Sequence, residues 1–329
     1  MLVAVKKRFT PKVNLKNGET QWRNHVISVR QFTREDLDEV LFPASEKMLT
    51  MVQEVGKVGF LSGKVLACLF FEPSTRTMSS FFTAIERLGG SAIAINNVQF
   101  SSVSKGESLR DTIRTLGGYT DAIVMRHPEE GSVAKAAECS PVPIINAGDG
   151  KGEHPTQALL DLFTIQRELS SIDGLTVTMV GDLAHGRTVH SLARLLTLYE
   201  DVKINFVSPA SLRMPAEKLA ELRGQGVVPR ELDRLDNDVV AESDVLYITR
   251  VQRERMTEEE KRIDNPFIVT AETMAHAKPK GKMILMHPLP RVGEISNEVD
   301  PDPRAAYFRQ SEYGMYVRMG ILKEILRSE

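Results

Sequence analysis

Residues 70–82 read Phe-Phe-Glu-Pro-Ser-Thr-Arg-Thr-Met-Ser-Ser-Phe-Phe. The apolar, partly β-branched run at 64–71 predicts a buried strand, and Ser74 is placed to cap a helix whose apolar residues follow at near-helical spacing. Three hydroxyls and the Arg76 guanidinium gather at this helix start, where backbone N–H groups already favour an anion. Taken alone, the motif also fits an ordinary capped helix with a solvated arginine. So many convergent donors nevertheless favour a phosphate.

Strand-like and helix-like segments alternate almost to the end of the chain. Strands are expected at 65–71, 92–95, 122–125, 143–146, 176–180, 203–207, 245–249 and 283–286. Helices are expected at 33–55, 77–88, 108–116, 155–169, 188–198, 215–223 and 313–327. This alternation predicts an α/β fold of doubly wound parallel sheets with helices on both faces. Ligands of such sheets bind where loops leave the carboxyl ends of the strands.

The length of 329 residues favours two domains, each large enough for its own core. The glycine-rich loop 146–155 is the best border between them. We expect a lead-in at 1–24, a first domain formed by 25–153 with 313–329, and a second domain at 154–312. The lead-in is basic, with Glu19 as its one acid, and is typical of a flexible segment or a linker left from a longer polypeptide.

The composition argues against several classes of protein. Hydrophobic residues make up 42% and charged residues 26% of a chain whose net charge is −2, so nothing global points to nucleic acid. No run is long enough to cross a membrane, and no secretory signal is present. Cys68 and Cys139 are too few for a disulfide scaffold and fit a reducing compartment, which we take to be the cytoplasm.

Four polar clusters follow predicted strands and carry cations, imidazoles or amides. They are Arg126-His-Pro128, His154-Pro-Thr-Gln157, Arg250-Val-Gln252 and His287-Pro-Leu-Pro-Arg291. One arginine after a strand usually just faces water. Together with the first motif, however, the clusters predict a crevice built for anions.

One motif points to another class of protein. Residues 181–188 follow a predicted strand and resemble a nucleotide P-loop, except that Arg187 replaces the lysine. That lysine is a point charge on phosphate, whereas arginine is a planar fork suited to a carboxylate. A nucleotide-binding protein therefore remains a distant alternative.

Metal and serine-hydrolase sites are not expected. The histidines at 127, 154, 185, 190 and 287 mostly lack Cys, Asp or Glu at ligand spacing, and neither H-E-x-x-H nor G-x-S-x-G occurs. His154 and His287 are the better site candidates because both stand beside prolines in strand-end loops.

Taken in order, these motifs resemble those of the aspartate carbamoyltransferase family, whose members join carbamoyl phosphate to L-aspartate early in pyrimidine synthesis. The resemblance runs from about Val26 to the last helix, through 74–77, 101–107, 125–128, 154–157, 186–190, 249–252 and 287–290. The stretch 302–310 is similar to the version found in multifunctional eukaryotic pyrimidine proteins. The resemblance implies a carbamoyl-phosphate-binding first domain, an aspartate-binding second domain, a C-terminal helix that returns to the first domain, and no cofactor.

The resemblance also implies roles for individual residues. Carbamoyl phosphate would contact Ser74, Thr75, Arg76, Thr77, Ser101, Lys105, Arg126, His154, Gln157, Pro288 and Leu289. Aspartate would contact Lys105, Arg187, Arg250, Gln252 and Leu289. The catalytic set would be Arg76, Thr77, Lys105, Arg126, His154 and Gln157. Within it, donors on the carbamoyl oxygen would act as an oxyanion hole, and the Leu289–Pro290 bond would be cis.

The family resemblance further implies an assembly and a motion. Ser101 and Lys105 would reach the neighbouring subunit's site, which implies a homotrimer with shared sites. Glu72 would pair with Arg187 and Arg255 when the domains close; alternatively, Glu72 only balances Arg76. Regulatory subunits, fused pyrimidine-pathway domains and allosteric control stay open.

The choice of substrate can be argued from charge. Carbamoyl phosphate and aspartate together carry about four negative charges. Five predicted cations would offset them and let the two substrates approach each other: Arg76, Lys105, Arg126, Arg187 and Arg250. Ornithine enzymes of this superfamily have a cysteine in the segment equivalent to 287–290, where this chain has proline. Aspartate is therefore favoured over ornithine. A carbamoyltransferase for another amine and a non-catalytic domain of the same fold are the remaining alternatives.

Overall fold

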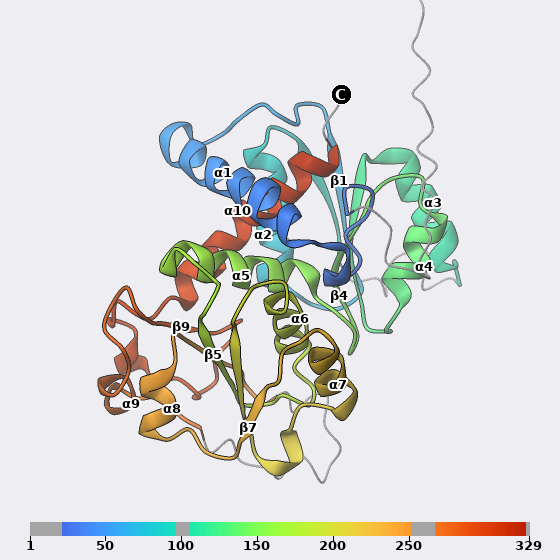
Figure 1. Ribbon diagram of the computed structural model, residues 1–329. Helices are drawn as coiled ribbons and strands as arrows, with labels where there is room; N and C mark the ends of the chain where they lie inside the picture. Colours follow the sequence, from blue (N-terminus) through green and yellow to red (C-terminus); the bar gives the residue numbers. More distant parts are fainter. Residues whose placement is uncertain (1–21, 97–105, 252–266, 327–329) are drawn as a thin grey trace, which may run out of the picture. The chain divides into compact units, whose positions relative to one another are not determined.

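The computed structural model describes residues 22–96, 106–251 and 267–326 (Figure 1). The chain divides into two compact units. Unit 1 contains 1–156 and 315–329, and unit 2 contains 157–314. The changes between units lie close to the borders expected at 153/154 and 312/313.

Unit 1 is built on a parallel sheet with the strand order β2-β1-β3-β4. The strands are β1 (Val65–Phe70), β2 (Ser91–Ile95), β3 (Ala122–His127) and β4 (Ile144–Asp149). The helices are α1 (Phe42–Val55), α2 (Thr75–Arg87), α3 (Leu109–Tyr119) and α4 (Ser132–Cys139). Apolar residues of α3 and α4, among them Ile113 and Val133, pack with Leu69 and Ile123 of the sheet in one core cluster. Figure 1 shows α3 and α4 together on one side of the sheet and α1 and α2 on the other.

The second half of helix α10 (Tyr307–Leu326) belongs to unit 1. Its Arg318 is buried, donates a 2.7 Å hydrogen bond to Ser80 Oγ of α2 and lies over the Phe81 ring. At Gly320 the helix comes so near α1 that an added Cβ would lie 3.0 Å from Ser45 Oγ. The return of the last helix to the first domain is confirmed.

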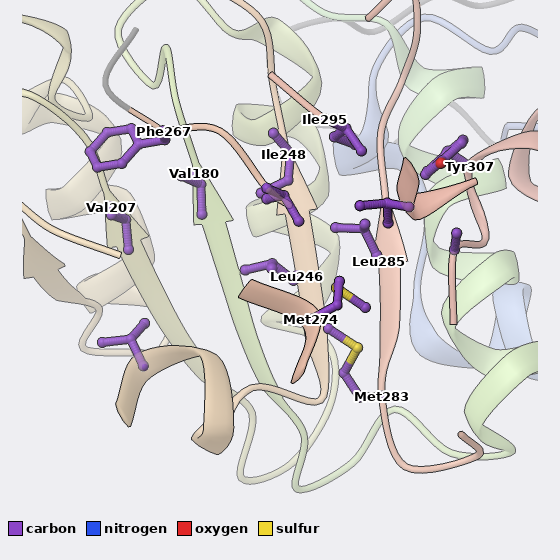
Figure 2. Close-up of a cluster of buried hydrophobic side chains, with 14 residues drawn as sticks. Val180, Val207, Leu246, Ile248, Phe267, Met274, Met283, Leu285, Ile295 and Tyr307 are labelled. Carbon is purple, nitrogen blue, oxygen red and sulfur yellow. The ribbon is translucent and has the colours of Figure 1, made fainter. Parts of the chain in front are cut away.

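Unit 2 contains a parallel sheet with the strand order β7-β6-β5-β8-β9. The strands are β5 (Thr176–Val180), β6 (Lys203–Val207), β7 (Arg230–Leu232), β8 (Val245–Ile248) and β9 (Ile284–Met286). The helices are α5 (Pro155–Leu169), α6 (Arg187–Leu196), α7 (Ala216–Gly224), α8 (Asn237–Glu242) and α9 (Ala271–Ala275). Figure 2 shows the core of one sheet face, where Val180, Leu246 and Leu285 from neighbouring strands gather with Met274 of α9.

The predicted α/β class with two parallel sheets is confirmed, although several elements differ from expectation. Strand β7 and helices α4, α8 and α9 were not predicted, and α10 begins at Tyr307 instead of 313. The helix expected at 33–55 contains a π-helical segment, Asp36–Leu41, ahead of α1. No helix in the described part of the chain is long and apolar enough to span a bilayer.

Candidate active site

Both sheets have a point where the strand order reverses. In unit 1 it lies between β1 and β3, and in unit 2 it lies between β5 and β8. Open parallel sheets bind ligands outside the carboxyl ends of the strands at such points. The predicted arginines lie at the carboxyl ends of these four strands: Arg126 is within the end of β3, and Arg76, Arg187 and Arg250 follow β1, β5 and β8.

The predicted phosphate motif occupies the turn from β1 into α2. Ser74 is the N-cap residue, with φ −156°, but its side chain makes no capping hydrogen bond. The predicted N-cap position of Ser74 is confirmed, although its hydroxyl does not supply the cap. The first helical hydrogen bond runs from Met78 N–H to Ser74 C=O at 3.1 Å, so the N–H groups of 75–77 precede the helical ladder. Thr77 is buried, whereas Thr75 and Arg76 are exposed.

Arg126 lies beside this turn because β1 and β3 pair in a register that matches Phe70 with Arg126. Its Nη1 donates to Ala147 C=O of β4 at 3.3 Å. Its Nε lies 3.2 Å from Glu72 Oε2, an ion pair by distance. The family resemblance implies a pairing of Glu72 with Arg187 and Arg255, and this pairing with Arg126 was not predicted.

His154 is 5% exposed and directly precedes α5. Its neighbour Glu153 holds the loop in place: Ser28 Oγ donates to Glu153 Oε1 at 2.6 Å, and Val29 N–H donates to Oε2 at 2.8 Å. The Glu153 N–H donates in turn to Asp149 Oδ1 at 3.0 Å. A segment far away in the sequence thus positions the residue before His154. Glu153 was not predicted, because an acidic residue in a glycine-rich loop shows no periodic pattern.

In unit 2, Arg187 is the first residue of α6 and is 6% exposed. The loop before it begins at Gly181, with φ +118°, where an added Cβ would lie 2.3 Å from the backbone oxygen of Thr249. Only glycine fits this approach. Asp182 is fully buried and accepts from His185 N–H at 3.0 Å. Because a carboxylate occupies this turn, the loop does not offer the amide cradle of a nucleotide P-loop.

Arg250 follows β8 and is half-buried. Because β8 pairs with β5 in parallel, Arg187 and Arg250 both lie beyond the carboxyl ends of the two central strands. The remaining predicted residues Ser101, Lys105, Gln252 and Arg255 lie outside the described residues.

The segment after β9 carries His287, Pro288 and Leu289, and its Leu289–Pro290 bond is cis, as the resemblance implies. His287 Nδ1 accepts from Leu289 N–H at 2.8 Å, and His287 Nε2 lies 2.6 Å from Glu294 Oε1. Burial lowers the pKa of His287. Burial favours a raised pKa for Glu294, but hydrogen bonds from His287 and the backbone outweigh it, and the pKa is lowered. A neutral imidazole therefore donates to a charged carboxylate.

Gln157 lies in the first turn of α5 and donates through Nε2 to Asp161 Oδ1 at 2.8 Å. Asp161 is fully buried and also accepts from Tyr247 and Gln310. These three residues were not predicted as part of the site. Asp161 could have been found from the sequence, since it is the one charged residue in the apolar run 158–165. In the described part of the chain, no three His, Cys, Asp or Glu side chains gather as metal ligands.

Comparison with known proteins agrees with this arrangement. The model of the aspartate/ornithine carbamoyltransferase carbamoyl-P binding domain matches residues 24–167, and that of the Asp/Orn binding domain matches residues 173–325. The chain belongs to the aspartate/ornithine carbamoyltransferase family. The family expected from the sequence motifs is confirmed.

The similar proteins include separate catalytic subunits and large multifunctional proteins. It is 52% identical to the aspartate carbamoyltransferase catalytic subunit of Methanothrix thermoacetophila, over 92% of this chain and 98% of that one. It is 55% identical to the multifunctional protein pyr1-3 of Dictyostelium discoideum, over 91% of this chain. The chain spans only 13–17% of the length of these multifunctional relatives. A crystal structure of Trypanosoma cruzi aspartate transcarbamoylase with carbamoyl phosphate and aspartate superimposes with a TM-score of 0.86 at 44% identity, over 92% of this chain and 96% of that chain.

Proposed function

We propose that this chain transfers the carbamoyl group of carbamoyl phosphate to the amine of L-aspartate, giving N-carbamoyl-L-aspartate and phosphate in pyrimidine synthesis. The observation that carries the proposal is the placement of an arginine at or just beyond the carboxyl end of each of the four strands that flank the two switch points. Parallel sheets of this kind bind anions there, and both substrates are anions.

The first substrate is assigned to unit 1. Ser74 to Thr77 bind the phosphate at the start of α2, where backbone N–H groups and the Arg76 guanidinium supply donors. Arg126, His154 and Thr77 donate to the carbamoyl oxygen, which gains negative charge when the amine attacks. The contact from Arg126 to Ala147 holds one end of this guanidinium in place before the substrate arrives.

The second substrate is assigned to unit 2. Arg187 and Arg250, with Gln252, bind the two carboxylates of aspartate. Gln157 and the backbone of Pro288 and Leu289 hold the carbamoyl NH2. The buried position of Arg187 strengthens its attraction for a carboxylate, because little water remains to screen it.

The reaction depends more on positioning the two substrates than on acid–base side chains of the protein. The neutral amine of aspartate forms a bond to the carbamoyl carbon, and the bond from that carbon to the phosphate oxygen breaks. The leaving phosphate accepts the proton that the amine loses. Donors aimed at the carbonyl oxygen stabilise the tetrahedral intermediate, and loss of one costs about 10²–10³ in turnover.

An acceptor-resolved assay tests the proposal. The protein is supplied with carbamoyl phosphate and, in turn, aspartate, ornithine or another amine, and the carbamoylated product is identified. We expect N-carbamoyl-aspartate alone. Product from ornithine instead would establish the alternative acceptor, and no product with any amine would favour a non-catalytic domain.

Arg250→Ala refines the same test. It should raise the KM for aspartate by about 100-fold and that for carbamoyl phosphate far less, because a charged hydrogen-bond donor to one substrate is lost. Equal changes in both constants would contradict the assignment of Arg250.

The proposal extends to a cytoplasmic homotrimer whose sites are shared between subunits through Ser101 and Lys105. Fused pyrimidine-pathway domains or regulatory chains, with allosteric control, belong to it where they accompany the chain. The multifunctional relatives support the first of these arrangements. Mixing Arg76→Ala protein with Lys105→Ala protein tests the shared site. Hybrid trimers should recover part of the activity, and no recovery despite measured subunit exchange would refute it.

A further inference from the structure

We propose that Asp161 is a positioning residue that sets Gln157 and the Pro288–Leu289 backbone at the same time. The inference rests on the proposed function, in which both of these hold the carbamoyl NH2. It assigns a role to a buried carboxylate that itself touches no substrate.

Three neutral groups donate to the Asp161 carboxylate. Gln157 Nε2 and Gln310 Nε2 donate to Oδ1 at 2.8 and 2.6 Å, and the Tyr247 hydroxyl donates to Oδ2 at 2.7 Å. Asp161 and Tyr247 are fully buried, and Gln310 is 1% exposed. An ionised carboxylate only accepts hydrogen bonds, so it satisfies all three donors and fixes which atom of each partner faces it.

The first consequence concerns the Gln157 amide. Such an amide has a donor end and an acceptor end of nearly equal size, and in isolation it can present either. Here the donor end is held by Asp161, because a flipped amide would place its oxygen against the carboxylate oxygen. The Gln157 carbonyl oxygen is therefore left to accept from a ligand. A carbamoyl NH2 group needs such an acceptor.

The second consequence concerns the loop after β9. Gln310 donates to Asp161, and its other end accepts from His287 N–H at 2.9 Å. Asp161 thus sets both ends of this amide as well. His287 then accepts from Leu289 N–H and pairs with Glu294, so Leu289 is three hydrogen bonds away from Asp161. Misplacing a positioning group by about 1 Å can cost about 100-fold in rate.

The third donor, Tyr247, lies on β8, the strand that Arg250 follows. Burial raises the pKa of Tyr247 well above its usual range, and the charge and hydrogen bond of Asp161 act in the same direction. Tyr247 therefore stays a hydroxyl donor at every pH used for assays.

The alternative is that Asp161 only stabilises the fold, and a double-mutant cycle separates the two roles. Asp161→Ala should lower kcat/KM for carbamoyl phosphate by about 100-fold in the native background. In a Gln157→Ala background, one of the two groups that Asp161 sets is already missing, and the further loss should be no more than about tenfold. Losses of equal size in the two backgrounds would overturn the inference.

Ser243→Ala is the matched control. Ser243 follows α8, and its loss removes two buried 2.6 Å hydrogen bonds, one with Thr178 of β5 and one to Val239 C=O, neither of which involves Gln157 or the loop after β9. The variant should lose stability in urea and change kcat/KM by less than about threefold. A loss of activity as large as that of Asp161→Ala would mean that any buried defect in this unit does the same, which would also overturn the inference.

Gln310→Met carries the test if Asp161→Ala does not fold. It keeps a side chain of similar length, leaves Gln157 on Asp161, and removes the two hydrogen bonds through which Gln310 joins Asp161 to His287. We expect a loss of about tenfold in kcat/KM with a native circular dichroism spectrum, and no loss would refute the link. The native protein is assayed first: if it makes no N-carbamoyl-aspartate, the proposed function fails, whereas an active native protein with unaffected variants rejects the role of Asp161 alone.

Discussion

The stability of unit 1 should fall between pH 7.5 and pH 5 because of one buried histidine. His25 has no exposed surface, and its Nδ1 accepts a 3.0 Å hydrogen bond from Ile144 N–H. An imidazole that accepts at Nδ1 is neutral, and a proton on that atom would face the N–H donor. Burial lowers the pKa of His25 from 6.5 to about 4.

The size of the effect follows from the two protonation equilibria. The unfolded chain takes up a proton below pH 6.5, whereas the folded protein does so only near pH 4, so the unfolded state binds more protons between these values. The stabilisation is complete above pH 6.5 and is lost as the pH falls. Each pH unit within the window costs about 1.4 kcal/mol, which amounts to about 2 kcal/mol between pH 7.5 and pH 5.

Urea unfolding at a series of pH values measures this loss. The chain contains a single tryptophan, Trp22, which lies near His25 in the sequence. Trp22 is buried and stacks on Phe32, so its fluorescence reports on the folding of unit 1. In His25→Asn, the amide oxygen can replace Nδ1 as acceptor for Ile144 N–H, but the side chain does not titrate.

The variant should start less stable and then lose about 2 kcal/mol less than the native protein over the same pH range. His276→Asn, at an exposed histidine, is the control and should follow the native curve. The reasoning fails if the native and His25→Asn curves run parallel from pH 7.5 to pH 5.

Three further variants test contacts described above. Gly181→Ala should cost about 3 kcal/mol or more, seen as a lower urea midpoint, because its Cβ would overlap the Thr249 carbonyl; an unchanged midpoint would show that the loop relaxes easily. Glu153→Ala removes two hydrogen bonds from segment 28–29 and should lower kcat about tenfold by loosening the loop before α5, so native turnover would contradict this role. Arg309→Met breaks a two-pronged ion pair with α5 at 2.7 and 2.8 Å, and because this pair is partly exposed it should cost no more than about 1 kcal/mol, less in high salt; a salt-independent loss would point to packing instead.

Most of the fold was predictable because its strands are short apolar runs between turn residues. Strand β7 was missed because Arg230–Leu232 is short and polar, with two exposed residues at the edge of its sheet. Helix α4 was missed because Ser132–Cys139 is short and rich in alanine, and begins at Gly131 in the left-handed region. Both elements owe their existence to neighbours that local patterns do not describe.

The candidate site was predictable where the chemistry lies in contiguous motifs. Ser74 to Thr77 and 154–157 are recognisable because the strand end, the turn and the ligand groups are neighbours in the sequence. The groups that support them are not, since Glu153 depends on Ser28, and Asp161 on Gln310, across more than a hundred residues. Such pairs leave no periodic signal. A charged residue inside an apolar helical run is the one trace that reading the sequence could have used.

The hydrogen bond between Ser28 and Glu153 also affects the choice of amino-terminal truncations. Residues 22–32 look dispensable in the sequence, since they precede the first regular helix. Fragments that start after residue 29 would nevertheless leave the Glu153 carboxylate without both of its donors from that segment. Truncated versions should therefore begin ahead of Trp22. Low activity in a version that begins after residue 29 would be explained by the missing donors to Glu153 and would say nothing about the activity of the longer chain.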